Sequence, residues 1–147
     1  MTVDHYLEAQ VLTAPPEQLH MMVVDGALRF ARAGVQALSE ADYEMSHESF
    51  SRSREFVNEL ISGLSAEGDP ELVRNLQALF GFVHRALIAA DGQRDAQKAN
   101  DAIKILEQHR ATWVELMEKL KQEQATGSAP LDSPMTERDD ATRSWVS

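Results

Sequence analysis

Two pairs of residues have the Glu-x-x-His spacing with which helical bundles hold a di-iron centre. The pairs are Glu17 with His20 and Glu44 with His47. Such a centre needs both pairs, and two further carboxylates, to converge inside one four-helix bundle. Each pair lies near the start of its own predicted helix, and antiparallel packing separates those two starts by roughly 30 Å, at about 1.5 Å per residue. We therefore expect no metal site and no cofactor.

Other catalytic arrangements do not fit the sequence either. A histidine phosphotransfer bundle normally has a Lys and a small residue one turn after its exposed His. His84 is followed by "RALIA" and His47 by "ESFSR", and neither stretch matches. No grouping of Ser, Asp and His indicates an activated nucleophile. We predict that the protein is not an enzyme.

The apolar residues recur with the 3.6-residue period of helices in four long segments. These segments are about 16–38, 43–64, 70–91 and 99–120, and the last fades within 121–127. Pro16 and Pro70 suit first helical positions, and Asp42 and Asp69 are good N-caps. Because the links span only about 4 to 6 residues, successive helices must be antiparallel neighbours. The predicted fold class is all-α, an antiparallel up-down-up-down four-helix bundle.

The bundle is predicted to occupy residues 15–124, with a different segment on each side. Residues 1–14 carry Tyr6, Leu7 and Val11 at spacings that fit a short helical segment lying on the bundle. Residues 125–147 are rich in Ser, Thr, Pro and Asp and show no periodicity. That composition is typical of disorder, so we expect a disordered C-terminal tail.

Charge and hydropathy exclude several classes of partner. The formal net charge is −10, so a nucleic acid would be repelled. No apolar run approaches the roughly 20 residues that span a bilayer, so we expect no membrane insertion. The N-terminus "MTVDHYLEAQ" has an acidic residue where a signal peptide would have basic ones. A cytoplasmic, soluble protein is the expectation.

The first helix carries more apolar residues than one core-facing stripe requires. Beside its core sector lies a second stripe of Met21, Val24, Leu28 and Val35. Weaker second stripes on the other helices contain Met45, Phe56, Phe82, Ile105 and Leu116. We expect these side chains to be at least partly solvent-facing, forming grooves that an amphipathic helix could fill. The alternative is that the first helix is simply the most central one.

The stretch "YLEAQVLTAPPEQLHMMVVDGALRF" resembles the opening of the flagellar secretion chaperones, the FliS family. The matching residues are Tyr6, Val11, Thr13, Ala14, Pro16, Glu17, Leu19, Asp25, Gly26, Ala27 and Phe30. Further matches are "NEL" at 58–60, "NLQALFGFV" at 75–83, "AAD" at 89–91 with Asp95, and Trp113. The sequence departs from the family at Pro15, where a capping Ser is usual, and at Val24, where Tyr is frequent.

The resemblance implies a cytosolic export chaperone that holds the C-terminal segment of flagellin. In the family that segment is disordered when free and becomes helical as it wraps around the bundle, which prevents premature polymerisation and keeps flagellin export-competent. The resemblance also implies that the N-terminal segment is a displaceable lid. The predicted partner-binding residues are Tyr6, Leu7, Val11, Met21, Val24, Leu28, Val35, Phe56, Phe82, Ile105 and Leu116.

Several questions stay open at the level of sequence. An export-gate component is a further potential partner, and the same apolar stripe would serve a homodimer in the absence of client. The alternative function is a structural or adaptor bundle, homodimeric or a scaffold, without a flagellin client. These readings differ in what covers the second stripe of the first helix.

Overall fold

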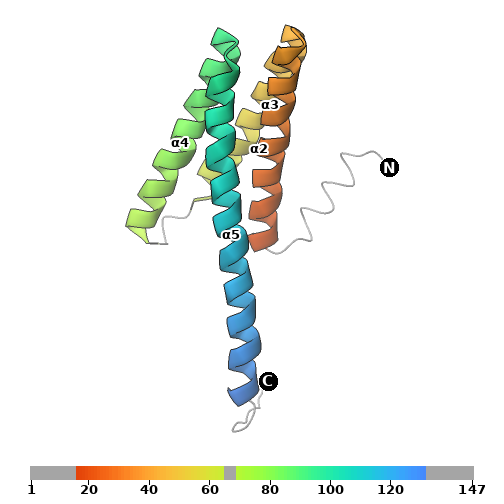
Figure 1. Ribbon diagram of the computed structural model, residues 1–147. Helices are drawn as coiled ribbons and strands as arrows, with labels where there is room; N and C mark the ends of the chain where they lie inside the picture. Colours follow the sequence, from red (N-terminus) through yellow and green to blue (C-terminus); the bar gives the residue numbers. More distant parts are fainter. Residues whose placement is uncertain (1–15, 65–68, 132–147) are drawn as a thin grey trace, which may run out of the picture. The chain divides into compact units, whose positions relative to one another are not determined.

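The computed structural model describes residues 16–64 and 69–131, with side chains described as far as Thr126. It contains four helices, namely α2 (Pro16–Ser39), α3 (Tyr43–Ser62), α4 (Pro70–Gln93) and α5 (Ala96–Leu131). Successive helices run in opposite directions (Figure 1), and the described residues contain no strand. The prediction of an all-α, antiparallel four-helix fold is confirmed.

The chain divides into two compact units, Met1–Arg110 and Ala111–Ser147, and α5 contributes to both. The predicted fourth helix fades within 121–127, whereas α5 continues to Leu131. The predicted lid segment and residues 132–147 of the predicted tail lie outside the described residues. The packing described below is that of the first unit.

The helices start where the sequence provides caps. Asp42 accepts a hydrogen bond from the Met45 amide at 3.2 Å, and Asp69 accepts one from the Glu71 amide at 3.0 Å. These carboxylates satisfy amide groups that have no partner inside their helices. The turn after α4 needs a left-handed residue, which is Arg94 with φ 53°. The starts predicted for the second and third helices are therefore confirmed.

Helices α2 and α3 form the most extensive helix pair. Small residues make this possible, because the Phe56 ring lies over Gly26 and the Phe50 ring lies over Gly34. At the same interface the buried Ser53 hydroxyl donates a hydrogen bond of 2.7 Å to the Ala27 carbonyl. The hydroxyl is thus satisfied without water, as a buried polar group requires.

The core is built from one stripe of each helix. Its largest fully buried apolar side chains are Phe50, Phe80, Leu87, Leu106, Val24, Val57 and Val83. On α5 the buried positions include Ala99 and Ala102, whose small side chains let the neighbouring helices approach. Among the described helices, none combines the length and apolar character that a membrane span needs.

The expected solvent exposure of the second stripe on α2 is wrong for its central residues. Val24 is 0% exposed and Leu28 is 2% exposed. The cause is α5, which covers this side of α2. Two charge contacts flank the stripe, one from Arg110 Nε to Asp25 and one from Arg32 Nη2 to Glu107, each 2.6 Å long. In the bundle α2 therefore has neighbours on both sides, and its broad apolar sector is mostly core.

Candidate functional site

The residues predicted to bind a partner do not form one patch. Val24 and Leu28 are buried, Val35 is half-buried against the core, and Met21 is half-buried. A partner could reach the first two only if the bundle opened. Tyr6, Leu7 and Val11 lie outside the described residues. Leu116 belongs to the second unit, where its side chain is 44% exposed.

Phe56 belongs to the outer side of the α2–α3 interface. Its ring stacks on that of Phe30, with centroids 5.9 Å apart and planes at 15°. The guanidinium groups of Arg29 and Arg52 lie 5.1 and 5.0 Å from the centre of the Phe30 ring. This aromatic pair is thus already covered within the chain, partly by cation–π contacts.

Phe82 lies on a different part of the surface, on the flank of α4 that faces away from α3. The flank that faces α3 is marked by Asp91, whose carboxylate is hydrogen-bonded to His47 Nδ1 at 2.7 Å and pairs with Arg54 at 3.4 Å. His84, seven residues earlier, shares that flank. Leu79 is five residues before His84, about 140° around the helix at about 100° per residue. Leu79 and Phe82 therefore lie on the opposite flank, which borders α5.

Leu72 extends this apolar flank toward the start of α4. It precedes Leu79 by seven residues and is 54% exposed, the largest value among the described large apolar side chains, while Phe82 is 44% exposed. Its spacing from Leu76 and Val83 places Leu72 on the core-facing stripe of a helical wheel, but the side chain is exposed. Leu72 is the third residue of α4, whereas the buried positions of α4 lie between Phe80 and Ala90.

Ile105 is the apolar residue of α5 that faces this flank of α4. The flank of α5 that faces α2 carries Glu107 and Arg110, whose partners are on α2. Ile105 lies two residues before Glu107, which is about 200° around the helix. It is also one turn before His109, whose ring meets the Phe80 ring of α4 edge-on at 5.0 Å. Ile105 therefore lies on the side of α5 that faces α4.

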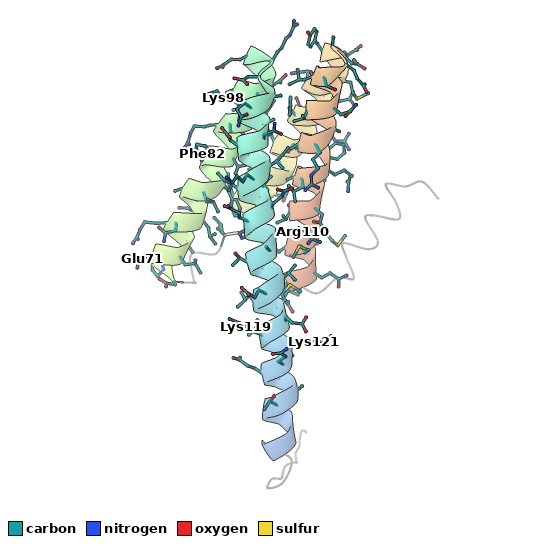
Figure 2. All side chains as sticks on the ribbon, in the orientation of Figure 1. Glu71, Phe82, Lys98, Arg110, Lys119 and Lys121 are labelled. Atoms are coloured by element: carbon teal, nitrogen blue, oxygen red, sulfur yellow. The ribbon has the colours of Figure 1, made fainter. Side chains whose placement is uncertain are left out.

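These positions define an apolar seam between α4 and α5, made of Leu72, Leu79, Phe82 and Ile105. Figure 2 labels Phe82 on α4 and Lys98 on α5, the two helices that border it. Leu79 and Ile105 are half-buried against the core, whereas Leu72 and Phe82 are exposed. The four side chains carry no group that could transfer a proton or ligate a metal. The seam is suited to burying apolar side chains of another segment.

Sequence reasoning predicted Phe82 and Ile105 but missed Leu72 and Leu79. The signal that would have found them is the spacing of the apolar residues. Leu79 follows Leu72 by seven residues and Phe82 follows Leu79 by three, so all three lie on one flank of α4. Tyr43 lies in register with the buried residues Phe50 and Val57, yet it is 41% exposed, and the Arg94 guanidinium lies 3.8 Å from the centre of its ring. Val114 and Leu120 continue the apolar periodicity of 99–120, yet each is 44% exposed in the second unit.

The two Glu-x-x-His pairs hold their histidines in unrelated surroundings. His20 contacts His109 of α5, and His47 contacts Asp91 of α4. Within the described residues no three His, Cys, Asp or Glu side chains are grouped so that they could hold a metal ion. The apolar seam is therefore the strongest candidate for a functional site.

Comparison with known proteins gives this architecture a family. The family model described as flagellar protein FliS matches residues 2–120, which is most of the chain. The chain belongs to the FliS family. FliS proteins are secretion chaperones, so the chain is placed among chaperones and not among enzymes.

Three relatives carry the name flagellar secretion chaperone FliS. The protein of Salmonella typhimurium is 28% identical over 114 residues, which is 77% of this chain and 84% of the relative. The protein of Bacillus subtilis is 25% identical over 108 residues, covering 74% and 80%. That of Vibrio cholerae is 23% identical over 107 residues, covering 73% and 79%. The resemblance read from the sequence is thereby confirmed.

Proposed function

We propose that the protein is a cytoplasmic export chaperone that binds the C-terminal segment of flagellin. Its membership of the FliS family, whose named relatives are flagellar secretion chaperones, carries this proposal. A chaperone for an exported subunit must cover the subunit's assembly surface and must later release it. A groove that accepts an amphipathic helix meets both needs, because it buries apolar area without a covalent bond.

The seam of Leu72, Leu79, Phe82 and Ile105 is our proposed first contact for the client. Leu72 and Phe82 are 54% and 44% exposed, so they have apolar area left to bury. Full burial of a large apolar side chain is worth roughly 1.5–3 kcal/mol relative to exposure. The client loses conformational entropy when it becomes helical, and several such contacts are needed to offset that cost.

The buried residues Val24 and Leu28 enter the proposal only indirectly. Their burial in the core leaves them no surface for a client, so their contribution is to the stability of the bundle. The part of the proposal that concerns Tyr6, Leu7 and Val11 rests on the resemblance alone. We propose that they act as a lid, which a client displaces from the groove.

Direct binding tests this function. A synthetic peptide that spans the C-terminal segment of flagellin would be titrated into the full chain by calorimetry, and the complex would be sized by light scattering. We expect a one-to-one complex and a gain of helical circular dichroism, because the peptide folds on binding. Absence of binding would contradict the proposal. A stable dimer that the peptide does not dissociate would favour the structural or adaptor alternative.

A further inference from the structure

His20 of α2 and His109 of α5 meet ring to ring near the start of α2. Their Nε2 atoms are 2.8 Å apart, their ring centroids are 5.1 Å apart, and the ring planes form an angle of 69°. The distance between the ring centroids exceeds the distance between the Nε2 atoms by about the sum of the two centroid-to-Nε2 distances. The two centroids and the two Nε2 atoms therefore lie nearly on one line. Each Nε2 atom therefore points straight at the other. This head-on geometry is that of an N–H···N hydrogen bond.

The same geometry argues against a metal ion between the two rings. Two imidazoles that ligate one ion direct their lone pairs to a common point beside the line that joins the nitrogens. Here the lone-pair directions lie along that line. In the described part of the chain, no group of three metal-ligating side chains exists to complete such a site. A proton fits between the two nitrogens, and a metal ion does not.

The pair is enclosed by three helices. The edge of the His109 ring meets the Phe80 ring of α4, with centroids 5.0 Å apart and planes at 86°. The nearest charged side chains along α2 and α5 are Glu17, one turn before His20, and Asp25 with Arg110, which are hydrogen-bonded to each other.

Three titratable groups of α3 and α4 contact one another rather than the histidine pair. Arg54 and His47 of α3 both contact Asp91 of α4. The pKa of His84 of α4 is lowered by burial and then by Arg54 and Arg85. The pair itself is half-buried and packs against the Phe80 ring, and in such a setting charge on either ring is costly.

Protonation decides whether the hydrogen bond can exist. A neutral imidazole has one donor and one acceptor, so two neutral rings share one N–H···N bond. The bond survives when one ring carries an extra proton, but two protonated rings would direct donors at each other. Burial, followed by the charge of His109, lowers the pKa of His20 to about 4, and burial also lowers the pKa of His109.

We propose that the hydrogen bond between His20 and His109 is a proton-operated latch, which holds the start of α2 against α5 and releases this end of the bundle as pH falls. The far end of α2 has a different attachment, through Gly34 under the Phe50 ring. Breaking the histidine contact therefore opens the start of α2 and leaves its far end attached to α3. Because α2 begins at Pro16, the latch holds the point at which residues 1–15 join the bundle.

The direction of the pH effect follows from proton binding. A histidine whose pKa is lower in the closed form than in the open form binds more protons when the latch is open. Closure is therefore strongest above the ordinary pKa of 6.5 and weakens as pH falls toward about 4. Each histidine exposed by opening raises the opening equilibrium by up to about tenfold per pH unit in this window.

Two measurements on the full chain test the latch. Nitrogen-15 spectra of the imidazole rings at pH 7 should show one ring protonated at Nε2 and the other at Nδ1. Hydrogen exchange, corrected for intrinsic rates, should show that amides of 20–24 open at least about tenfold more at pH 5 than at pH 7. Amides of 50–60 should change much less over the same range.

Variants separate the latch from general acid sensitivity. The double variant His20→Gln with His109→Gln should lose most of the pH dependence of opening at 20–24. The matched control is His84→Gln, which removes another histidine of lowered pKa and should keep that dependence. Identical tautomers on the two rings would overturn the proposal, and so would a double variant that opens as steeply with pH as the wild type. If the double variant fails to fold, the tautomers of the wild type decide.

Discussion

The Phe50 ring of α3 lies directly over Gly34 of α2, where an added Cβ atom would have no room. The Phe56 ring repeats this relationship over Gly26, eight residues earlier, where an added Cβ would be 2.7 Å from a ring atom. Glycine inside a helix costs roughly 0.5–1 kcal/mol relative to alanine. The two glycines thus weaken α2 as an isolated helix but allow the close approach of α3.

The contact at Gly34 predicts that Gly34→Ala destabilises the bundle. The new methyl group displaces a fully buried aromatic ring, and such overpacking costs about 1–3 kcal/mol, more than the gain in helix propensity. Gly92→Ala is the matched control, because nothing lies within 4 Å of its added Cβ. Urea unfolding of both variants gives the comparison. Equal or higher stability of Gly34→Ala would show that the ring is free to move.

Burial predicts opposite outcomes for two leucines that look alike in the sequence. Leu28→Asp should cost about 3–5 kcal/mol, because it removes core packing and buries a carboxylate without a partner. Leu72→Asp should cost less than about 1 kcal/mol, since that side chain is 54% exposed. Thermal melts followed by circular dichroism measure both. Similar losses at the two positions would contradict the assignment of Leu28 to the core and Leu72 to the surface.

The helices and their starts could be predicted because their causes are local. Asp42 and Asp69 cap their helices through their own side chains, and Pro70 occupies a first helical position. None of these three roles depends on residues that are distant in the sequence. Periodicity also located the four helices along the chain. It failed at Val24 and Leu28, because a helical wheel shows that a residue is apolar but not which neighbouring helix covers it.

The candidate site was only partly predictable for the same reason. Phe82 and Ile105 lie outside the core stripes of their helices, and the sequence pattern indicated both. Leu72 is in register with the core stripe of α4, but it is exposed, because the buried positions of α4 begin only at Phe80. Where along a helix its burial begins is a tertiary property, and no local pattern encodes it.

The proposed lid predicts the effect of removing residues 1–10. Isolated helices shorter than about 12 residues are marginal in water, so the segment should be held weakly. We expect the truncated chain to melt slightly lower and to bind the flagellin peptide as tightly as the full chain, or more tightly, because an internal competitor is gone. Calorimetric titration of both chains measures this. Loss of binding would instead make the segment part of the client site.

The central claim is that the client binds at the seam, and two substitutions on α4 test it most directly. Phe82 lies on the flank bordering α5 and Ile88 lies on a different side of the helix, with exposed fractions of 44% and 48%. Phe82→Asp and Ile88→Asp therefore introduce the same charge at similar exposure, and both should leave the melting temperature nearly unchanged.

The deciding measurement is calorimetric titration of the flagellin C-terminal peptide into the wild type and these two variants. We predict that Phe82→Asp weakens binding by at least about tenfold, or about 1.4 kcal/mol, because the carboxylate would be desolvated beneath the client. Ile88→Asp should bind like the wild type. Unchanged affinity in Phe82→Asp, or an equal loss in both variants, would contradict a binding site at the seam.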